Sequence, residues 1–241
     1  MKGHVILLTG ASRGIGKALL EQLVADNQII AVARDESALQ ALQERYPEIH
    51  ILVADLGIPE QLRGVVRHIQ SEWPDLSMLI NNAGIQWPID FNKDVEADLI
   101  RNELDVNLYA PIELIRSLLP ILRQQPQSFI VNITSALALA PKQSTPIYCA
   151  TKAALRHFTL ALRTQLQGTN IKVIEVLPPL TKTALNHQLS HKGAVSAQWV
   201  ADKVMKGLKK GQEEIAVGQA QTALWLHKLV PGLLSKLMIG R

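Results

Sequence analysis

Short apolar runs alternate with stretches of helical periodicity along most of this chain. The segment His4–Thr9 contains four successive apolar residues, which is typical of a strand buried on both faces. Comparable runs predict further strands at 28–33, 50–54, 76–80, 129–134, 172–177 and 214–217. The segments between them, such as 59–72 and 93–125, have the period of helices. Strands and helices that alternate in this way predict a parallel sheet covered by helices.

Length and composition indicate how many such sheets to expect. The chain has 241 residues, of which 47% are hydrophobic and 19% charged, and this is enough for one sizeable core but not for two comfortable domains. We therefore expect a single doubly wound α/β domain over residues 1–241, with a seven-stranded parallel sheet flanked by helices.

Cysteine content, apolar runs and charge favour a cytoplasmic protein that does not bind nucleic acid. The single cysteine, Cys149, excludes an intrachain disulfide and fits a reducing compartment. The apolar run Val5–Leu8 is too short for a signal peptide, and no run approaches the length of a membrane span. Residues 201–241 contain seven Lys/Arg and three Asp/Glu, which accounts for the whole formal charge of +4. A general basic surface for nucleic acid is therefore not expected.

A glycine-rich turn, Gly10-Ala-Ser-Arg-Gly14-Ile-Gly16, follows the first strand and leads into a helical pattern. In such a turn the glycines let the backbone approach a phosphate, and the free N–H groups of the first helical turn face the anion. No Gly-Lys-Ser/Thr follows, which excludes a P-loop. Taken alone, the turn is equally compatible with an ordinary connection between a strand and a helix.

The end of the second strand indicates which dinucleotide would bind. Arg34 follows Ala33 in the region where an acidic residue usually accepts the ribose 2′-hydroxyl of NAD. Arg13 and Arg34 can converge on a 2′-phosphate, which favours NADP(H) over NAD(H). Asp35 is the argument against this preference, although it also suits the N-cap of the next helix. Asp55, after the third strand, is placed to meet the adenine.

Asn81-Asn82-Ala83-Gly84 follows the fourth strand. Ligands bind outside the carboxyl ends of parallel strands, so this loop is expected to face a cofactor. A plain turn of the same composition is the alternative.

Tyr148 and Lys152 form the candidate catalytic pair. They are four residues apart in a segment predicted to be helical, so their side chains share one face. A nearby ammonium lowers the pKa of a phenol from its ordinary value of about 10 towards the working pH, as a general acid for carbonyl reduction requires. Taken alone, such a pair is more commonly a packing residue and a solvated charge.

Together these motifs resemble the short-chain dehydrogenase/reductase family with its Rossmann-type fold, in the branch that has a catalytic tetrad. Asn107, Ser135, Tyr148 and Lys152 fall in the order and approximate spacing of that tetrad. The resemblance implies hydride transfer between a nicotinamide and a carbonyl or alcohol, in which Tyr148 is the general acid/base and Ser135 holds the substrate oxygen. It also implies that Lys152 binds the nicotinamide ribose and exchanges protons with solvent through a water near Asn107.

The same resemblance, joined to the motifs above, gives the expected cofactor contacts. These are Gly10, Ser12, Arg13, Gly14, Ile15, Gly16, Arg34, Asp55, Leu56, Asn82, Ala83, Gly84, Tyr148, Lys152, Pro178, Thr181 and Thr183. Pro178-Pro179 stands where the family usually has Pro-Gly, and this departure looks like the bacterial DltE-type oxidoreductase subgroup. The helices around 108–122 and 148–166 have more apolar surface than one stripe, and the family's usual dimer uses these two helices. A homodimer or homotetramer is therefore expected.

The C-terminal third is the least informative part of the sequence. Residues 184–200 are expected to form a substrate lid. His187 and His191 have a metal-compatible spacing within it, but surface histidines are the favoured interpretation and no metal is expected. In the tail at 220–241, apolar residues recur at helical spacing. Packing over the cleft or on a neighbouring subunit is favoured for this tail over contact with an anionic membrane.

Two other functions stay open at this point. One is a reductase of acyl-chain, 3-oxoacyl-type substrates, and the other is a non-catalytic nucleotide-sensing or scaffold protein on the same fold. The complete set of Asn107, Ser135, Tyr148 and Lys152 argues against the second, because a sensor does not need proton-transfer residues.

Overall fold

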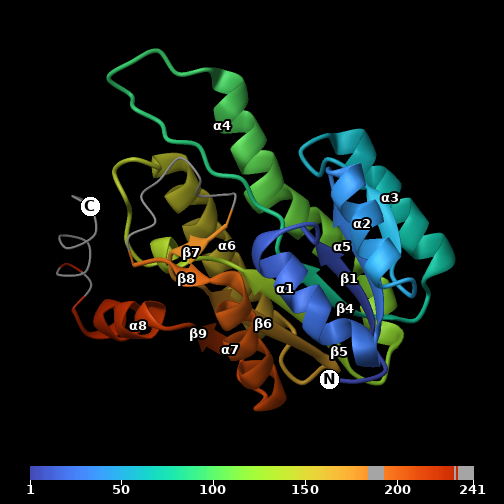
Figure 1. The fold of residues 1–241 in the computed structure, drawn as a ribbon. Helices are drawn as coiled ribbons and strands as arrows, with labels where there is room; N and C mark the ends of the chain where they lie inside the picture. The colour runs from blue at the N-terminus through green and yellow to red at the C-terminus, as the bar shows by residue number, and fades with distance from the viewer. Residues whose placement is uncertain (184–192, 231, 233–241) are drawn as a thin grey trace.

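The computed structural model of the chain describes residues 1–183, 193–230 and 232. At its centre is a parallel sheet of seven strands in the order β3-β2-β1-β4-β5-β6-β9 (Figure 1). Its strands are β1 Val5–Thr9, β2 Gln28–Ala33, β3 His50–Val53, β4 Leu76–Asn81, β5 Ser128–Ile133, β6 Ile171–Leu177 and β9 Glu214–Ala216. The predicted fold class is confirmed, and each strand boundary lies within one residue of its predicted position.

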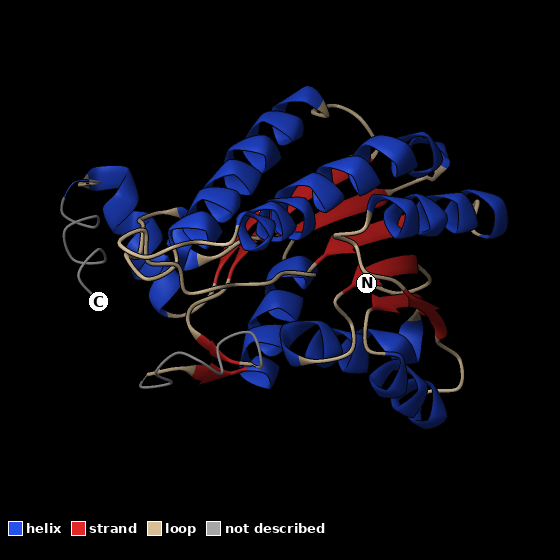
Figure 2. Ribbon diagram, turned by 90° about the horizontal axis from the view of Figure 1, so that it is seen from above, coloured by secondary structure: helices blue, strands red, loops and turns tan. Residues whose placement is uncertain are grey.

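Helices cover both faces of this sheet (Figure 2). On one face α1, α2 and α7 pack against the sheet, and on the other α3, α5 and α6 do so. The helices are α1 Gly14–Leu23, α2 Glu36–Arg45, α3 Pro59–Glu72, α4 Ala97–Leu104, α5 Ala110–Gln124, α6 Pro146–Gln165, α7 Ala197–Lys209 and α8 Gln219–Leu229. A second, two-stranded sheet pairs β7 Thr181–Lys182 with β8 Val195–Ser196.

The side chains of β1 explain why its sequence is apolar at successive positions. Ile6 and Leu8 belong to the core under α1 and α7, whereas Val5 and Leu7 belong to the core under α3 and α5. Successive strand residues point to opposite faces, so a strand covered on both faces needs apolar residues throughout. The strand order reverses next to β1, because β2 and β3 extend the sheet on one side and β4 on the other. A ligand crevice is expected at such a reversal.

A π-helical turn, η2 Asp105–Tyr109, joins α4 to α5. The single helix predicted over 93–125 begins later, at Ala97. Its hydrogen-bond spacing changes in the π-helical turn before the helix continues as α5 to Gln124. Such a turn inserts a residue into the helical ladder and is frequent at functional sites. Asn107 lies inside this turn and is fully buried.

Arg156 and Glu175 form a buried ion pair, which extends to the partly exposed Glu214 and the exposed Lys228. Arg156 of α6 donates to a carboxyl oxygen of Glu175 on β6 and, over 2.9 Å, to Glu214 of β9. The Thr134 hydroxyl donates to Glu175 over 2.7 Å, and the ammonium of Lys228 on α8 donates to Glu214 over 2.9 Å. This Arg156 network joins two strands and two helices. Glu175 is inaccessible to solvent, and burial raises the pKa of its carboxyl while Arg156 acts in the opposite direction.

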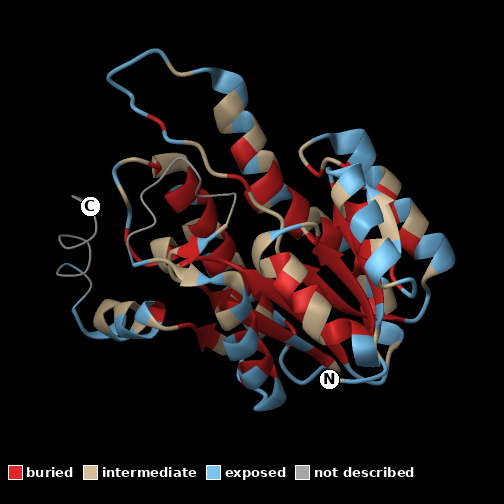
Figure 3. Cartoon of the chain, viewed as in Figure 1, coloured by how far each residue is buried: buried red, intermediate tan, exposed pale blue. Residues whose placement is uncertain are grey.

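The loop before α4 is largely exposed, and α8 has both intermediate and exposed residues (Figure 3). In α8, Trp225 and Leu229 are exposed, as is Val230 just beyond it. Of the predicted amphipathic tail, residues 231 and 233–241 lie outside the described residues. Among the helices that the structure describes, none is both long and apolar enough to cross a membrane.

Replacement of Arg156 by methionine should destabilise the fold strongly. Arg156→Met leaves the buried carboxyl of Glu175 without its cation, and breaking a buried pair in this way costs about 3–5 kcal/mol. The loss should be larger at pH 8 than at pH 5, because the unpaired carboxyl is neutral once it binds a proton. Urea unfolding at the two pH values measures both effects.

The exposed arginine Arg63, paired with Glu60, supplies the matched control. Arg63→Met should change the free energy of unfolding little, because water screens exposed ion pairs. Equal losses in the two variants would contradict the role of the Arg156 network.

Candidate active site

The glycine-rich turn brings β1 and α1 into close contact. Gly10 and Gly14 have φ values of 65° and 59°, a left-handed conformation that side chains rarely adopt. At Gly16 an added Cβ would lie 2.1 Å from the carbonyl oxygen of Gly10, so no larger residue fits. The helix begins at Gly14, which leaves the N–H groups of its first turn at the carboxyl edge of the sheet.

Thr9, at the end of β1, fixes the position of the loop after β4. Its hydroxyl oxygen accepts the backbone N–H groups of Asn82 and Ala83, each over 3.0 Å, and donates to the carbonyl of Ile80 over 3.3 Å. In return, the Asn82 amide donates to the carbonyls of Thr9 and Gly10, each over 3.0 Å. Thr9 is not among the site residues predicted from the sequence. Its position as the last residue of a buried strand, directly before Gly10, was the available signal.

A cavity of about 400 Å³ opens along this edge of the sheet. Of the expected cofactor contacts, fifteen line it: Gly10, Ser12, Arg13, Gly14, Ile15, Arg34, Asp55, Leu56, Asn82, Ala83, Gly84, Tyr148, Lys152, Pro178 and Thr183. Gly16 and Thr181 do not line it. Gly16 is used in the close approach described above, and the Thr181 hydroxyl donates to the carbonyl of Pro179 over 2.8 Å.

Sequence reasoning missed eight lining residues, namely Val32, Ala33, Asp35, Ala54, Ile85, Val106, Ile133 and Thr134. Most of them lie at or just after the carboxyl ends of β2, β3 and β5. The signal was present, because every strand of a parallel sheet presents its carboxyl end to the same crevice.

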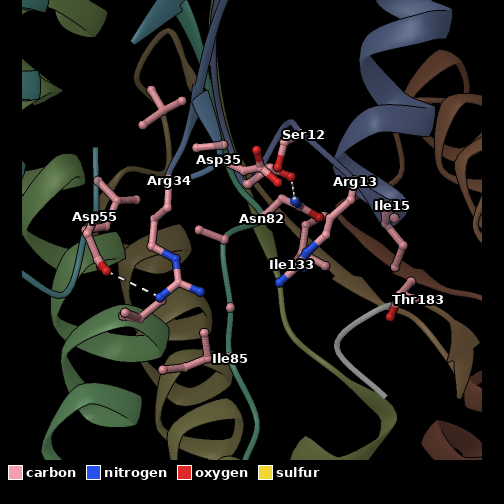
Figure 4. A pocket seen from close by; sticks show the side chains of 18 of the residues that line it. Ser12, Arg13, Ile15, Arg34, Asp35, Asp55, Asn82, Ile85, Ile133 and Thr183 are labelled. Atoms are coloured by element: carbon pink, nitrogen blue, oxygen red, sulfur yellow. Dashed lines mark hydrogen bonds and ion pairs between the residues drawn. The ribbon is translucent and has the colours of Figure 1, made fainter. Parts of the chain in front are cut away.

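Two arginines stand at separate places in this cavity (Figure 4). Arg34 reaches across to Asp55, with an Nη1–Oδ2 distance of 3.3 Å, and its side chain is half exposed. Arg13 lies in the glycine-rich turn near Ile15 and Thr183. Asp35 caps α2 by accepting the N–H of Ala38 over 3.0 Å, as its position in the sequence predicted.

The catalytic pair lies on the buried face of α6. The ammonium of Lys152 donates to the carbonyl of Ile133 over 2.9 Å, and its Nζ lies 5.7 Å from the centre of the Tyr148 ring. Ser135 follows β5 and interacts with the Tyr148 hydroxyl, while its own oxygen accepts the N–H of Leu137 over 3.1 Å. The structure therefore brings Ser135 to Tyr148, and Tyr148 and Lys152 both line the cavity.

Asn107 fastens the loop after β4 to the π-helical turn. Its carbonyl oxygen accepts the N–H of Ile85 over 2.8 Å, and its amide donates to the carbonyl of Ile85 over 2.8 Å and to the Thr151 hydroxyl over 3.2 Å. A Cβ on Gly84 would lie 3.3 Å from the Asn107 Oδ1 and 3.6 Å from the Lys152 Nζ. Both side chains therefore lie close to this glycine. Asn107 thus holds the wall of the cavity beside Lys152.

Burial has the largest effect on the pKa values of Tyr148 and Lys152. Burial raises the pKa of the Tyr148 phenol, and its hydrogen bond with Ser135 opposes this rise more weakly. Burial also lowers the pKa of Lys152 to about 8. The expectation that Lys152 lowers the pKa of Tyr148 is wrong for this state of the chain, in which the ammonium is bound to a backbone carbonyl. The phenol therefore carries its proton at neutral pH, the form from which a general acid donates.

His187 and His191 lie outside the described residues, as does most of the expected lid. In the ranges that the structure describes, no cluster of three or more His, Cys, Asp or Glu side chains is arranged to hold a metal ion. Cys149 is a buried free thiol beside the backbone of Lys142.

The sheet, the glycine-rich turn and the cavity define a dinucleotide-dependent α/β oxidoreductase. Residues 4–194 match the model of the short chain dehydrogenase family. The chain belongs to that family and is an NAD(P)-dependent enzyme of its DltE-type subgroup.

Three known proteins illustrate the relationship. A Bacillus subtilis (strain 168) protein named "Uncharacterized oxidoreductase DltE" is 38% identical over 223 residues, which cover 89% of this chain and 88% of that protein. A Schizosaccharomyces pombe protein named "NADP-dependent 3-hydroxy acid dehydrogenase" is 32% identical over 191 residues, covering 76% and 73%. The crystal structure of a short chain dehydrogenase from Burkholderia cenocepacia J2315 in complex with NADP superposes with a TM-score of 0.86, at 25% identity and 98% coverage of both chains.

Removal of the Thr9 hydroxyl should loosen the junction between β1 and the loop after β4. Thr9→Val keeps the shape of the side chain but leaves the N–H groups of Asn82 and Ala83 without their acceptor. Buried donors left unpaired cost about 1–3 kcal/mol, which urea unfolding measures.

Two further variants test the assignment to the hydroxyl. Thr9→Ser should recover most of the loss. Thr164→Val, at an exposed threonine whose hydroxyl only bonds a carbonyl of its own helix, should cost much less. A Thr9→Val protein as stable as the unchanged chain would show that the junction does not depend on these hydrogen bonds.

Proposed function

We propose that this protein is an NADP(H)-dependent oxidoreductase that interconverts a carbonyl and an alcohol, with Tyr148 as the general acid/base. The observation that carries the proposal is that Tyr148 and Lys152 line the same cavity as the glycine-rich turn. A nucleotide held at the turn would extend along the cavity to the catalytic pair. A hydride donor and a proton donor would then meet at one end of a single site.

The residues of the cavity fit a dinucleotide with a 2′-phosphate. The glycine-rich turn lines the cavity through Gly10 and Gly14, and the first turn of α1 supplies N–H groups for the pyrophosphate. Arg34 supplies the cation for the 2′-phosphate and would exchange Asp55 for that phosphate, whereas Arg13 stands at a separate place in the cavity. The NADP bound by the Burkholderia cenocepacia structure supports the same preference.

Each catalytic residue has a distinct task in this proposal. A bound nicotinamide supplies the hydride. The Tyr148 phenol donates its proton to the substrate oxygen as negative charge develops there, and the Ser135 hydroxyl holds that oxygen by a hydrogen bond. The charged ammonium of Lys152 stabilises the phenolate that the transfer leaves, and Asn107 keeps the wall beside it in place.

A 3-hydroxy acid and its 3-oxo partner form the second candidate substrate class. The Schizosaccharomyces pombe relative, 32% identical to this chain, is named an NADP-dependent 3-hydroxy acid dehydrogenase. Small aldehydes, ketones and 3-oxo acids therefore belong in one substrate panel.

The partially exposed faces of α5 and α6 support a homodimer built on these two helices.

Replacement of Tyr148 by phenylalanine should abolish turnover but preserve cofactor binding. Tyr148→Phe removes the proton donor and keeps the ring, and loss of a general acid typically lowers kcat by about 10²–10⁴-fold. NADPH oxidation at 340 nm across the panel measures turnover, and a fluorescence titration measures NADPH affinity.

Tyr109→Phe is the matched control, because Tyr109 is exposed and lies outside the cavity. It should leave turnover unchanged. Substantial activity in Tyr148→Phe would overturn the assignment of the general acid. NADPH binding without turnover of any panel substrate by the unchanged chain would favour the nucleotide-sensing alternative.

Replacement of Arg34 by alanine should remove the preference for NADPH. A lost charge-assisted hydrogen bond corresponds to roughly a 10- to 100-fold lower affinity for NADPH, while the affinity for NADH should change little. Arg45→Ala removes a comparably exposed arginine that pairs with Glu21 outside the cavity, and it should affect neither affinity. Equal affinity of the unchanged chain for NADH and NADPH would refute the proposed preference.

A further inference from the structure

Glu103 is a buried carboxyl that the proposed reaction does not use. It lies on α4, one helical turn before Asn107, and is inaccessible to solvent. Neither carboxyl oxygen has a hydrogen-bond partner within the part of the chain that the structure describes. A buried acid without hydrogen bonds is costly, so its retention in this place calls for a physical reason.

The surroundings of Glu103 point towards the catalytic pair. Helix α4 packs against α6, which contains Tyr148, Cys149 and Lys152. The charge of the Glu103 carboxyl acts to raise the pKa of each of these three side chains. From the loop after β4, the backbone N–H of Trp87 favours the charged carboxylate as a dipole, although it does not complete a hydrogen bond of ordinary geometry. Lys152 is the cation among these groups.

Lys152 presents the complementary problem. Its side chain is 3% exposed, and its ammonium donates to a neutral carbonyl, that of Ile133, and to no carboxylate within the described residues. By contrast, Arg156 lies one turn later on the same helix and is in direct contact with two carboxylates. A buried cation and a buried anion therefore act on each other across the α4–α6 contact, and among residues 1–183, 193–230 and 232 neither has a closer ion-pair partner.

We propose that Glu103 is the buried counter-charge of Lys152, a positioning residue that holds the ammonium in its charged form while Tyr148 and the cofactor use it. This inference rests on the proposed function, because it assigns to Glu103 the support of a lysine that takes part in catalysis. No bond is made or broken at Glu103. Its effect passes through space to the Lys152 Nζ.

The direction of the pH effect follows from burial. Burial raises the pKa of Glu103 to about 7 and lowers the pKa of Lys152 to about 8, so between these values both groups are charged. Above pH 8 Lys152 loses its proton. A neutral residue at position 103 removes the attraction that favours the ammonium, so the pKa of Lys152 should fall further and the charge should be lost at lower pH.

The test compares Glu103→Gln with the unchanged chain in two measurements. The first is NADPH affinity from pH 7 to 9.5, a range above the second pKa of a phosphate monoester at about 6. Burial raises the pKa of Tyr148 away from this range, so Lys152 is the lining group expected to titrate near pH 8. The second is the pH profile of kcat/KM with the best substrate of the panel.

In Glu103→Gln we expect the fall of NADPH affinity and of kcat/KM at alkaline pH to move to lower pH by roughly one unit. This is the smaller end of the pKa change that loss of a nearby opposite charge causes. Glu103→Asp restores the charge and should restore most of the profile. Glu96→Gln, at an exposed glutamate that precedes the same helix, should leave it unchanged. Circular dichroism and thermal unfolding establish that each variant is folded.

The outcomes separate the inference from the proposed function. Coincident pH profiles for Glu103→Gln and the unchanged chain would overturn the role of Glu103 and leave the proposed function standing. A fall in activity that is equal at every pH, and that Glu103→Asp does not correct, would also overturn it, because it would indicate a packing defect. An unchanged chain that does not bind NADPH would overturn the proposed function itself.

Discussion

The site depends on one junction at the carboxyl edge of the sheet, where the neighbouring strands β1 and β4 end. The Thr9 hydroxyl accepts two N–H groups from the loop after β4, and the Asn82 amide returns two hydrogen bonds to the backbone of Thr9 and Gly10. Without this junction, the glycine-rich turn and the loop that leads to Ile85 would be independent of each other. Since Asn107 holds Ile85 on its other side, the hydrogen bonds run from the turn to the π-helical segment beside Lys152.

Helix α6 contains two buried cations that differ in how they are stabilised. Arg156 is in contact with Glu175 and Glu214, and an arginine stays charged at any pH at which the protein is folded. Lys152 has a carbonyl partner and a pKa lowered to about 8, so its charge depends on its surroundings. The first arrangement is suited to holding the sheet and helices together. The second is suited to chemistry, because a group that titrates near neutrality can exchange protons.

Much of the fold could be predicted from the sequence, because the parallel sheet is buried on both faces and its strands are therefore continuous apolar runs. Most of the residues that line the cofactor cavity were predicted from the glycine-rich turn, the loop after β4 and the family resemblance, whereas several residues at the other strand ends were missed. The π-helical turn at 105–109 could not be predicted, because an insertion in the ladder has no fixed composition. Asn107, a polar residue inside the predicted helix 93–125, lies within this turn.

Buried charges were the other part that the sequence left open. The partner of Glu175 is Arg156, which lies 19 residues earlier in the chain on helix α6, and no local pattern joins the two. Glu103 looks like one more solvent-facing glutamate of an amphipathic helix until the packing of α4 on α6 is known. Whether a polar residue is buried depends on tertiary contacts, which single-sequence periodicity does not contain.

The Arg156 network also constrains how this family of chains can diverge. Arg156, Lys228, Glu175 and Glu214 together bring two positive and two negative charges, so the group is electrically neutral. A single replacement leaves an excess charge at the junction of α6, β6, β9 and α8, whereas a paired replacement does not. Evolutionary change at these four positions should therefore be correlated, with arginine and glutamate lost together. The correlated positions would include Arg156 on the catalytic helix α6 and Lys228 on the C-terminal helix α8.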